Sequence, residues 1–413
     1  MYRQIVLTIF LLKDTMKFVE TTLEEKILIL STKLPFSEED KDSIEELLLQ
    51  KIDWGLLINL SASCGILPLM AKNLLKINSD SIPRFTLEEA SKRHQMEYTL
   101  NHLILWNEFK NIIKIGKQGG VPIMPIKGII LTEILSSNLG LRRTSDIDIL
   151  VKKEHLPKIE SELVNLEYIL EPFQLKNRDL MINTHFHLPF KNQNPAGLPV
   201  IIELHWDILP SLMRIDNLVD DFWNNAVIQE VSGEEVLTLS YEDFLFESVI
   251  ELYKDITGYA PFLPKRHFDI SQILQVYGRK INWEAFIKKT ESYGLRGLVY
   301  YALSLNKELF NNYTLPQEIL HKLKPSLCKR IFISNALKRV DLLHKLRFSL
   351  FISEVILLRN RWKVLFLRLV CWAFPDIYIY RKTKRINYIV FTALNLFYRL
   401  LRRIFRNILN KGR

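Results

Sequence analysis

The sequence has few cysteines and no apolar run long enough to cross a membrane. Cys64, Cys328 and Cys371 are the only cysteines among 413 residues, and they lie far apart without metal-ligand spacing. A sparse, odd number of cysteines is typical of a reducing compartment and argues against a disulfide framework. No uncharged apolar run approaches the roughly 20 residues that a transmembrane helix needs. We therefore expect a cytoplasmic protein, with peripheral attachment to the inner face of the membrane as an open alternative.

The first residues resemble only a weak signal peptide. One arginine precedes a mostly apolar run from Ile5 to Leu12, but this run is short and no small-residue cleavage site follows it. An ordinary helix, or a start at Met16, is the simpler interpretation of the same residues.

Internal repeats and low-complexity linkers are also absent, and the composition is that of a globular protein. The length leaves room for two or three domains. The formal charge of +10 is uneven, because residues 339–413 carry 17 Lys and Arg against 3 Asp and Glu, a net of +14, which leaves −4 for the first 338 residues. The positive charge therefore belongs to the tail, and it says little about which substrate the first 338 residues bind.

The N-terminal part has the apolar spacing of helices and no cluster of His, Cys or carboxylate side chains. We predict helices over residues 24–34, 38–52, 54–75 and 87–116, with Gly65 and Pro68 interrupting the third. Ser37 is the predicted N-cap of the second helix. The pattern favours a packing role, or one wall of a substrate site.

The most informative stretch is residues 121–151, VPIMPIKGIILTEILSSNLGLRRTSDIDILV. Its pattern predicts a short strand, a turn at Lys127-Gly128, a helix over 129–139 that ends at Gly140, a loop and a second strand. The turn at a helix start fits a phosphate site: glycine lets a ligand approach the backbone, the helix N-terminus is electropositive, and lysine adds a charge. A structural role for the lysine is the alternative.

Asp146 and Asp148 lie two residues apart in the second strand, so we expect both carboxylates on one face and the intervening isoleucines in a core. Like charges at this spacing repel, and a divalent cation is the simplest compensation. A later apolar strand, VIIELHW at 200–206, carries Glu203 as a third acid, either a metal ligand or a base for the acceptor. A solvated strand edge, or an arginine partner for Glu203, is the alternative.

Other polar side chains accompany these acids. Arg142 and Arg143 come just before the aspartates and either hold phosphate or pair with the carboxylates; spacing alone does not separate them. His185 and His187 share a strand face and could bind a metal, although core or pocket-wall roles are commoner. His205 shares the face of Glu203, as a structural or a site-lining residue. The segment 192–199 predicts a hairpin between the two strands.

We divide the chain into a helical region at 17–118, an α/β core at 119–235, a second helical region at 236–335 and a basic amphipathic tail at 336–413. The tail sets arginines among aromatic and aliphatic residues. Such a helix either packs on the body with a solvated basic face or lies on an anionic membrane surface. Nucleic-acid binding is disfavoured, because the aromatics have the spacing of a core rather than of a stacking platform.

Residues 126–151 followed by VIIELHW resemble the bacterial uncharacterised nucleotidyltransferase family, within the DNA polymerase β-like nucleotidyltransferase superfamily. Asp146, Asp148 and Glu203 match its three acids. The Lys127-Gly128 turn and Arg142 match the family's turn and its arginine before the first acid. Ile129 stands where the superfamily has a serine after the glycine. Residues that flank the motif agree as well, and these are Asp53-Trp54, Ile66-Leu67-Pro68, His267, Asp269, Asn282-Trp283 and Tyr293-Gly294-Leu295.

The resemblance implies an α+β (mixed α/β) fold, with a polymerase β-like core, a small mixed sheet and flanking helices. It also implies that one or two Mg²⁺ ions support transfer of a nucleoside monophosphate from an NTP to an acceptor, with pyrophosphate release. A sugar, a lipid-linked precursor and a peptide are all open as acceptors, since relatives are associated with surface-polysaccharide or peptide natural-product pathways. A non-catalytic binding module that docks such a pathway at the membrane, and a metal-dependent phosphoester hydrolase, are the alternatives.

Overall fold

The fold is that of a computed structural model of the 413-residue chain. The structure describes residues 22–135, 139–193, 198–209, 214–257, 264–310 and 315–326. The signal-like N-terminal segment, the alternative start at Met16 and the basic tail at 336–413 lie outside the described residues.

The N-terminal region is helical, as the apolar spacing predicts. Its helices are α2 (Leu23–Ser31), α3 (Glu38–Leu48), α4 (Trp54–Ser63), α5 (Leu67–Leu74) and α6 (Arg84–Gly119). Ser37 caps α3, because its Oγ accepts a hydrogen bond from the Asp40 N–H at 3.1 Å. The interruption predicted in the third helix is confirmed: Gly65 has a φ of +70°, and Pro68 lies in the first turn of α5.

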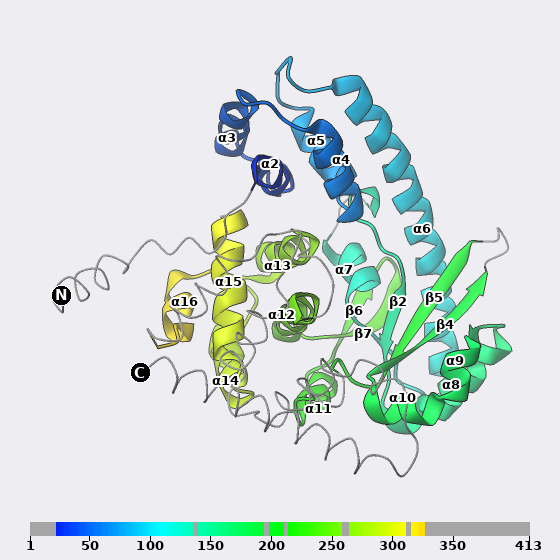
Figure 1. The fold of residues 1–413 in the computed structure, drawn as a ribbon. Helices are drawn as coiled ribbons and strands as arrows, with labels where there is room; N and C mark the ends of the chain where they lie inside the picture. Colours follow the sequence, from blue (N-terminus) through cyan, green and yellow to red (C-terminus); the bar gives the residue numbers. More distant parts are fainter. Residues whose placement is uncertain are drawn as a thin grey trace, which may run out of the picture. The chain divides into compact units, whose positions relative to one another are not determined.

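A hydrophobic core joins these N-terminal helices. Its fully buried side chains include Ile27 of α2, Ile44 of α3, Leu57 of α4, Leu67 of α5 and Leu87 of α6. Complete burial of one such side chain contributes about 1.5–3 kcal/mol. The core therefore fixes the start of the long helix α6, which continues to the sheet (Figure 1).

A mixed five-stranded sheet forms the centre of the α/β part. Its strands are β1 (Met124–Pro125), β2 (Ile147–Leu150), β3 (Ile169–Leu170), β4 (His187–Gln193) and β5 (Pro199–His205). They are ordered β1-β2-β5-β4-β3, and β2 with β5 is the one parallel pair of this sheet. The antiparallel pairing of β4 with β5 confirms the predicted hairpin. The fold class, a mixture of many helices with a small mixed sheet, is also as predicted.

Short helices connect the strands. They are α7 (Gly128–Leu135), η1 (Leu139–Leu141), η2 (Lys153–His155), α8 (Leu156–Asn165), α9 (Pro172–Lys176) and α10 (Arg178–Thr184). The prediction that a helix runs to residue 139 and stops at Gly140 is wrong, because Gly140 lies within η1. A Cβ at Gly140 would lie 2.8 Å from the carbonyl oxygen of Gln95. The glycine therefore allows η1 to pack closely on α6.

The C-terminal described region returns to helices. Its elements are α11 (Leu218–Asn224), β6 (Val227–Val231), β7 (Glu234–Thr238), α12 (Tyr241–Thr257), α13 (Pro264–Tyr277), α14 (Trp283–Ser292), α15 (Arg296–Phe310) and α16 (Gln317–Leu323). Helix α13 packs on both α12 and α7. It therefore places α12 and α13 near the turn that precedes α7 (Figure 1). Helix α6 ends beside the predicted boundary at 118, whereas β7 crosses the one at 235. Among the described residues, no helix has both the length and the apolar character that crossing a bilayer requires.

Candidate active site

The turn between β1 and α7 holds Lys127 in an unusual backbone conformation. Its φ is +59°, in the left-handed region that non-glycine residues seldom adopt. Its carbonyl oxygen accepts a hydrogen bond from the Leu131 N–H at 3.1 Å, so Lys127 immediately precedes the helix that begins at Gly128. A strained residue of this kind costs about 1–3 kcal/mol and is found most often at functional sites.

The Lys127 side chain contacts acids, and its predicted phosphate contact stays a prediction. Its Nζ lies 3.0 Å from Asp148 Oδ1 and 3.5 Å from Glu251 Oε1. Lys127 is 7% exposed and Asp148 is 4% exposed, so this charge pair is buried. Burial alone would raise the pKa of Asp148, but the Lys127 ammonium and a hydrogen bond with His205 hold it well below its usual value. The lysine thus supplies part of the compensation that the sequence assigned to a cation.

The three predicted acids lie close to one another. Asp148 is directly opposite Glu203 because β2 and β5 pair in parallel register, and the two carboxyl groups are within hydrogen-bonding reach. Asp146 lies just before β2. Burial, followed by the negative charges of Asp148 and Glu203, raises the pKa of Asp146 to about 6. The structure therefore brings together three carboxyl groups whose combined negative charge Lys127 offsets only in part.

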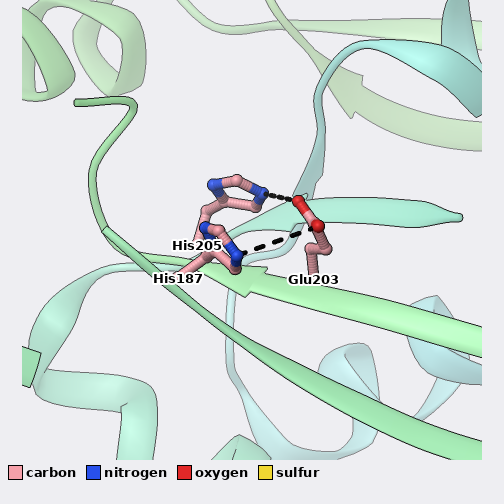
Figure 2. Close-up of side chains that lie close together, drawn as sticks. All are labelled: His187, Glu203 and His205. Carbon is pink, nitrogen blue, oxygen red and sulfur yellow. Dashed lines mark hydrogen bonds and ion pairs between the residues drawn. The ribbon is translucent and has the colours of Figure 1, made fainter. Parts of the chain in front are cut away.

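Two histidines face Glu203 from adjacent strands. His205 Nε2 lies 2.9 Å from Asp148 Oδ1 and 3.2 Å from Glu203 Oε2, and His187 Nε2 lies 3.8 Å from Glu203 Oε1. Figure 2 shows both imidazole rings directed toward the Glu203 carboxylate. Burial lowers the pKa of His187 to about 2, so this ring is neutral at pH 7. His185, which the sequence grouped with His187, instead places its Nδ1 2.9 Å from Thr184 Oγ1.

Arg142 pairs with a carboxylate, and a phosphate contact for it stays a prediction. Its Nε and Nη2 donate to Asp269 Oδ1 and Oδ2 of α13 at 2.6 and 2.7 Å, and its Nη1 donates to Thr132 Oγ1 at 3.1 Å. The bidentate pair is buried and fastens the loop before β2 to α13. Arg143 is exposed, and its backbone N–H donates to the Gly65 carbonyl oxygen at 2.8 Å. A phosphate contact for Arg143 stays a prediction.

Helix α12 adds acids that the sequence interpretation missed. Glu247 and Glu251 are buried one helical turn apart, and Glu251 pairs with both Lys127 and Lys254. Despite burial, these two lysines lower the pKa of Glu251 to about 2. Burial and the charge of Glu251 raise the pKa of Glu247 to about 8, so Glu247 keeps its proton at pH 7. Two acids four residues apart in an apolar helical run were the available indication.

The turn glycine leaves space beside the acids. A Cβ at Gly128 would lie 3.5 Å from Thr144 Cγ2 and 4.0 Å from Asp146 Oδ1, both ordinary contact distances. Packing within the described residues therefore does not require glycine here, and the Asp146 carboxylate lies beside the start of α7. Such a helix start favours anions, because its free N–H groups and dipole are electropositive.

Comparison with known proteins agrees with these features. The family model described as uncharacterised nucleotidyltransferase matches residues 50–311. A solved structure, that of an antigenic nucleotidyltransferase-like protein from Paracoccidioides brasiliensis, is 12% identical, covers 54% of this chain and 96% of its own, and gives a TM-score of 0.31, too low to support an argument. No curated protein matches the chain. Because the family match spans more than half of its length, the chain belongs to the uncharacterised nucleotidyltransferase family.

Proposed function

We propose that the protein is a Mg²⁺-dependent nucleotidyltransferase, which transfers a nucleoside monophosphate from a nucleoside triphosphate to an acceptor and releases pyrophosphate. The observation that carries this proposal is the convergence of Asp146, Asp148 and Glu203 beside the Lys127-Gly128 turn. Membership of the family supports it. A sugar, a lipid-linked precursor and a peptide are the candidate acceptors that the sequence resemblance leaves open.

The three acids fit a Mg²⁺ ion. Mg²⁺ prefers carboxylate oxygens, and the pKa of Asp146 is raised first by burial and then by the charges of Asp148 and Glu203, which a cation would offset. Asp146, Asp148 and Glu203 would hold the ion. When bound, it would neutralise charge on the reacting phosphate.

The remaining residues of the site hold the acids in place and give the triphosphate and the acceptor access to them. Lys127 keeps Asp148 ionised and fixed, and His205 orients Asp148 and Glu203 by contacting both. Gly128 opens the start of α7 to the triphosphate. The Glu203 side chain is 25% exposed, against 5% for Asp148. An acceptor hydroxyl therefore reaches Glu203 more readily, which suits Glu203 as its base as well as a metal ligand.

Thermal unfolding with a panel of nucleoside triphosphates tests the proposal. We expect at least one triphosphate to raise the Tm of the wild type in the presence of Mg²⁺, and Asp146→Asn to abolish that rise. Release of pyrophosphate with candidate acceptors would separate transfer from phosphoester hydrolysis and from simple binding. A wild type that responds to no triphosphate with Mg²⁺ would contradict the proposal.

Gly128→Ala should separate folding from binding. The added methyl group has room, so we expect the free energy of unfolding to change by less than about 1 kcal/mol. The methyl would point toward Asp146, where phosphates approach the start of α7, and we expect triphosphate affinity to fall about tenfold or more. Titration of both proteins with the stabilising triphosphate measures the effect. Gly55→Ala in α4 is the control, because among the described residues a Cβ there meets only Asp53 Oδ1 at 3.4 Å. Unchanged affinity in Gly128→Ala would contradict a role for the Lys127-Gly128 turn in triphosphate binding.

The membrane role of the basic tail is a separate proposal. We expect the full chain to float with anionic liposomes and a chain without residues 339–413 to stay at the bottom of the gradient, because the tail carries the net positive charge. Neutral liposomes are the control. Equal flotation of the two chains would discard the tail as a membrane anchor.

A further inference from the structure

His187, Glu203 and His205 hold one donor atom each within 4.8 Å of the others. Antiparallel pairing of β4 with β5 puts His187 directly opposite His205, and Glu203 lies two residues before His205 on β5. The two imidazole rings are 4.9 Å apart between centroids, and both Nε2 atoms face the same carboxylate (Figure 2). The register of the β4–β5 hairpin therefore places all three side chains together. Paired strands are a rigid support for a metal site.

We propose that these three residues bind a transition-metal ion of the Zn²⁺ and Co²⁺ class, without any need for a nucleotide. Imidazole nitrogen suits such ions, whereas Mg²⁺ is held mainly by oxygen ligands. The set thus differs in chemistry from Asp146 and Asp148, which offer oxygen only. The inference goes beyond the proposed nucleotidyl transfer and shares Glu203 with it, so an ion held here would be a neighbour of the proposed Mg²⁺.

The charges around Glu203 favour a cation at this position. Within the described part of the chain, Glu203 has the imidazoles of His187 and His205 nearby, and no lysine or arginine lies within ion-pair distance of it. His205 is also shared with Asp148, whose Oδ1 lies 2.9 Å from its Nε2. A metal ion among the three would supply the missing positive charge directly.

The exposure of two of the three side chains is also compatible with a bound ion. The side chains of His187 and Glu203 are 23% and 25% exposed, which gives an ion a route from solvent and leaves room for a water ligand. Each ring must offer its Nε2 lone pair and carry its proton on Nδ1. Both Nδ1 atoms are buried without a hydrogen-bond partner among the described residues, so the bound ion must outweigh two unpaired Nδ1–H groups and the hydrogen bond that His205 Nε2 makes with Asp148.

Titration of the metal-free full-length protein with Co²⁺, without nucleotide, tests the site through the visible absorption of the bound ion. We expect one equivalent to bind at least about 100-fold more tightly than Mg²⁺, with Zn²⁺ displacing it. His187→Ala should weaken Co²⁺ binding about 100-fold or more, and His187→Gln should do the same while retaining a polar side chain of similar length. His185→Ala is the matched control, since His185 lies in the same segment with its Nδ1 on Thr184.

The outcomes separate this site from the proposed function. Asp146→Asn should lose the response to Mg²⁺ and triphosphate yet keep the Co²⁺ absorption. Co²⁺ that binds no more tightly than Mg²⁺, or with equal affinity in the wild type and both His187 variants, would overturn the histidine site and leave nucleotidyl transfer standing. A wild type that binds Co²⁺ but responds to no triphosphate would contradict the transferase and retain the metal site.

Discussion

Asp148→Asn should abolish Mg²⁺-dependent binding of a triphosphate and also lower the stability of the free protein. Asparagine removes a metal ligand and the nearest partner of the buried Lys127 ammonium. Breaking a buried ion pair costs 3–5 kcal/mol in general, and we expect about 3 kcal/mol here, because Glu251 remains 3.5 Å from Lys127 Nζ. Urea unfolding without ligand measures the stability, and the Tm shift with triphosphate measures the binding.

Asp146→Asn is the matched control for that experiment. Burial and then the charges of Asp148 and Glu203 raise the pKa of Asp146, so its ionised carboxylate is unfavourable in the free protein. Removal of this charge should leave the unliganded protein as stable as the wild type, or more so, while the triphosphate response is lost. If Asp148→Asn kept the full response to triphosphate and Mg²⁺, Asp148 would not be a metal ligand.

Arg142→Ala should have the largest effect on stability, a loss of about 3–5 kcal/mol, because it leaves Asp269 buried without its bidentate partner. Asp269→Ala should cost a similar amount. The double variant should lose clearly less than the sum, since the second substitution removes a charge that the first left unpaired. Urea unfolding of the four proteins gives the coupling free energy, and strict additivity would contradict the pair.

Arg143→Ala separates the two neighbouring arginines. Arg143 is exposed, so its removal should change stability by less than about 0.5 kcal/mol. A weakened triphosphate response in Arg143→Ala would assign it the phosphate contact that the sequence could not place on either residue. An unchanged response would leave the start of α7 as the principal phosphate contact.

Local rules account for the parts of the fold that could be predicted. Asp53 and Asn282, which flank the family motif, each cap a helix by accepting a backbone N–H, at 2.9 and 3.1 Å. Gly294 ends α14 with a φ of +70°. Alternating apolar residues indicated the hairpin of β4 and β5, and the acids on β2 and β5. Each of these patterns depends on residues near one another in the sequence.

The remainder depends on contacts between distant segments, which no local pattern reports. The partner of Arg142 lies 127 residues later, on α13. Glu247 and Glu251 face Lys127 only because α12 and α13 pack together and α13 reaches α7. By its place in the sequence, next to Gly128 at a helix start, Lys127 fits a phosphate ligand. Packing also makes its ammonium group the counter-charge of two buried acids, which no local pattern predicts.

The parallel alignment of β2 with β5 has a consequence for when the proposed site is completed during synthesis. Asp148 and Glu203 come from opposite ends of a long crossover, and a shift of one residue would turn Glu203 to the other side of the sheet. During synthesis, no cation can be captured by the full set of acids until β5 has been made and has docked. The proposed response to Mg²⁺ and triphosphate therefore requires β5, the last strand of the five-stranded sheet in chain order, and fragments that end before residue 199 should lack that response.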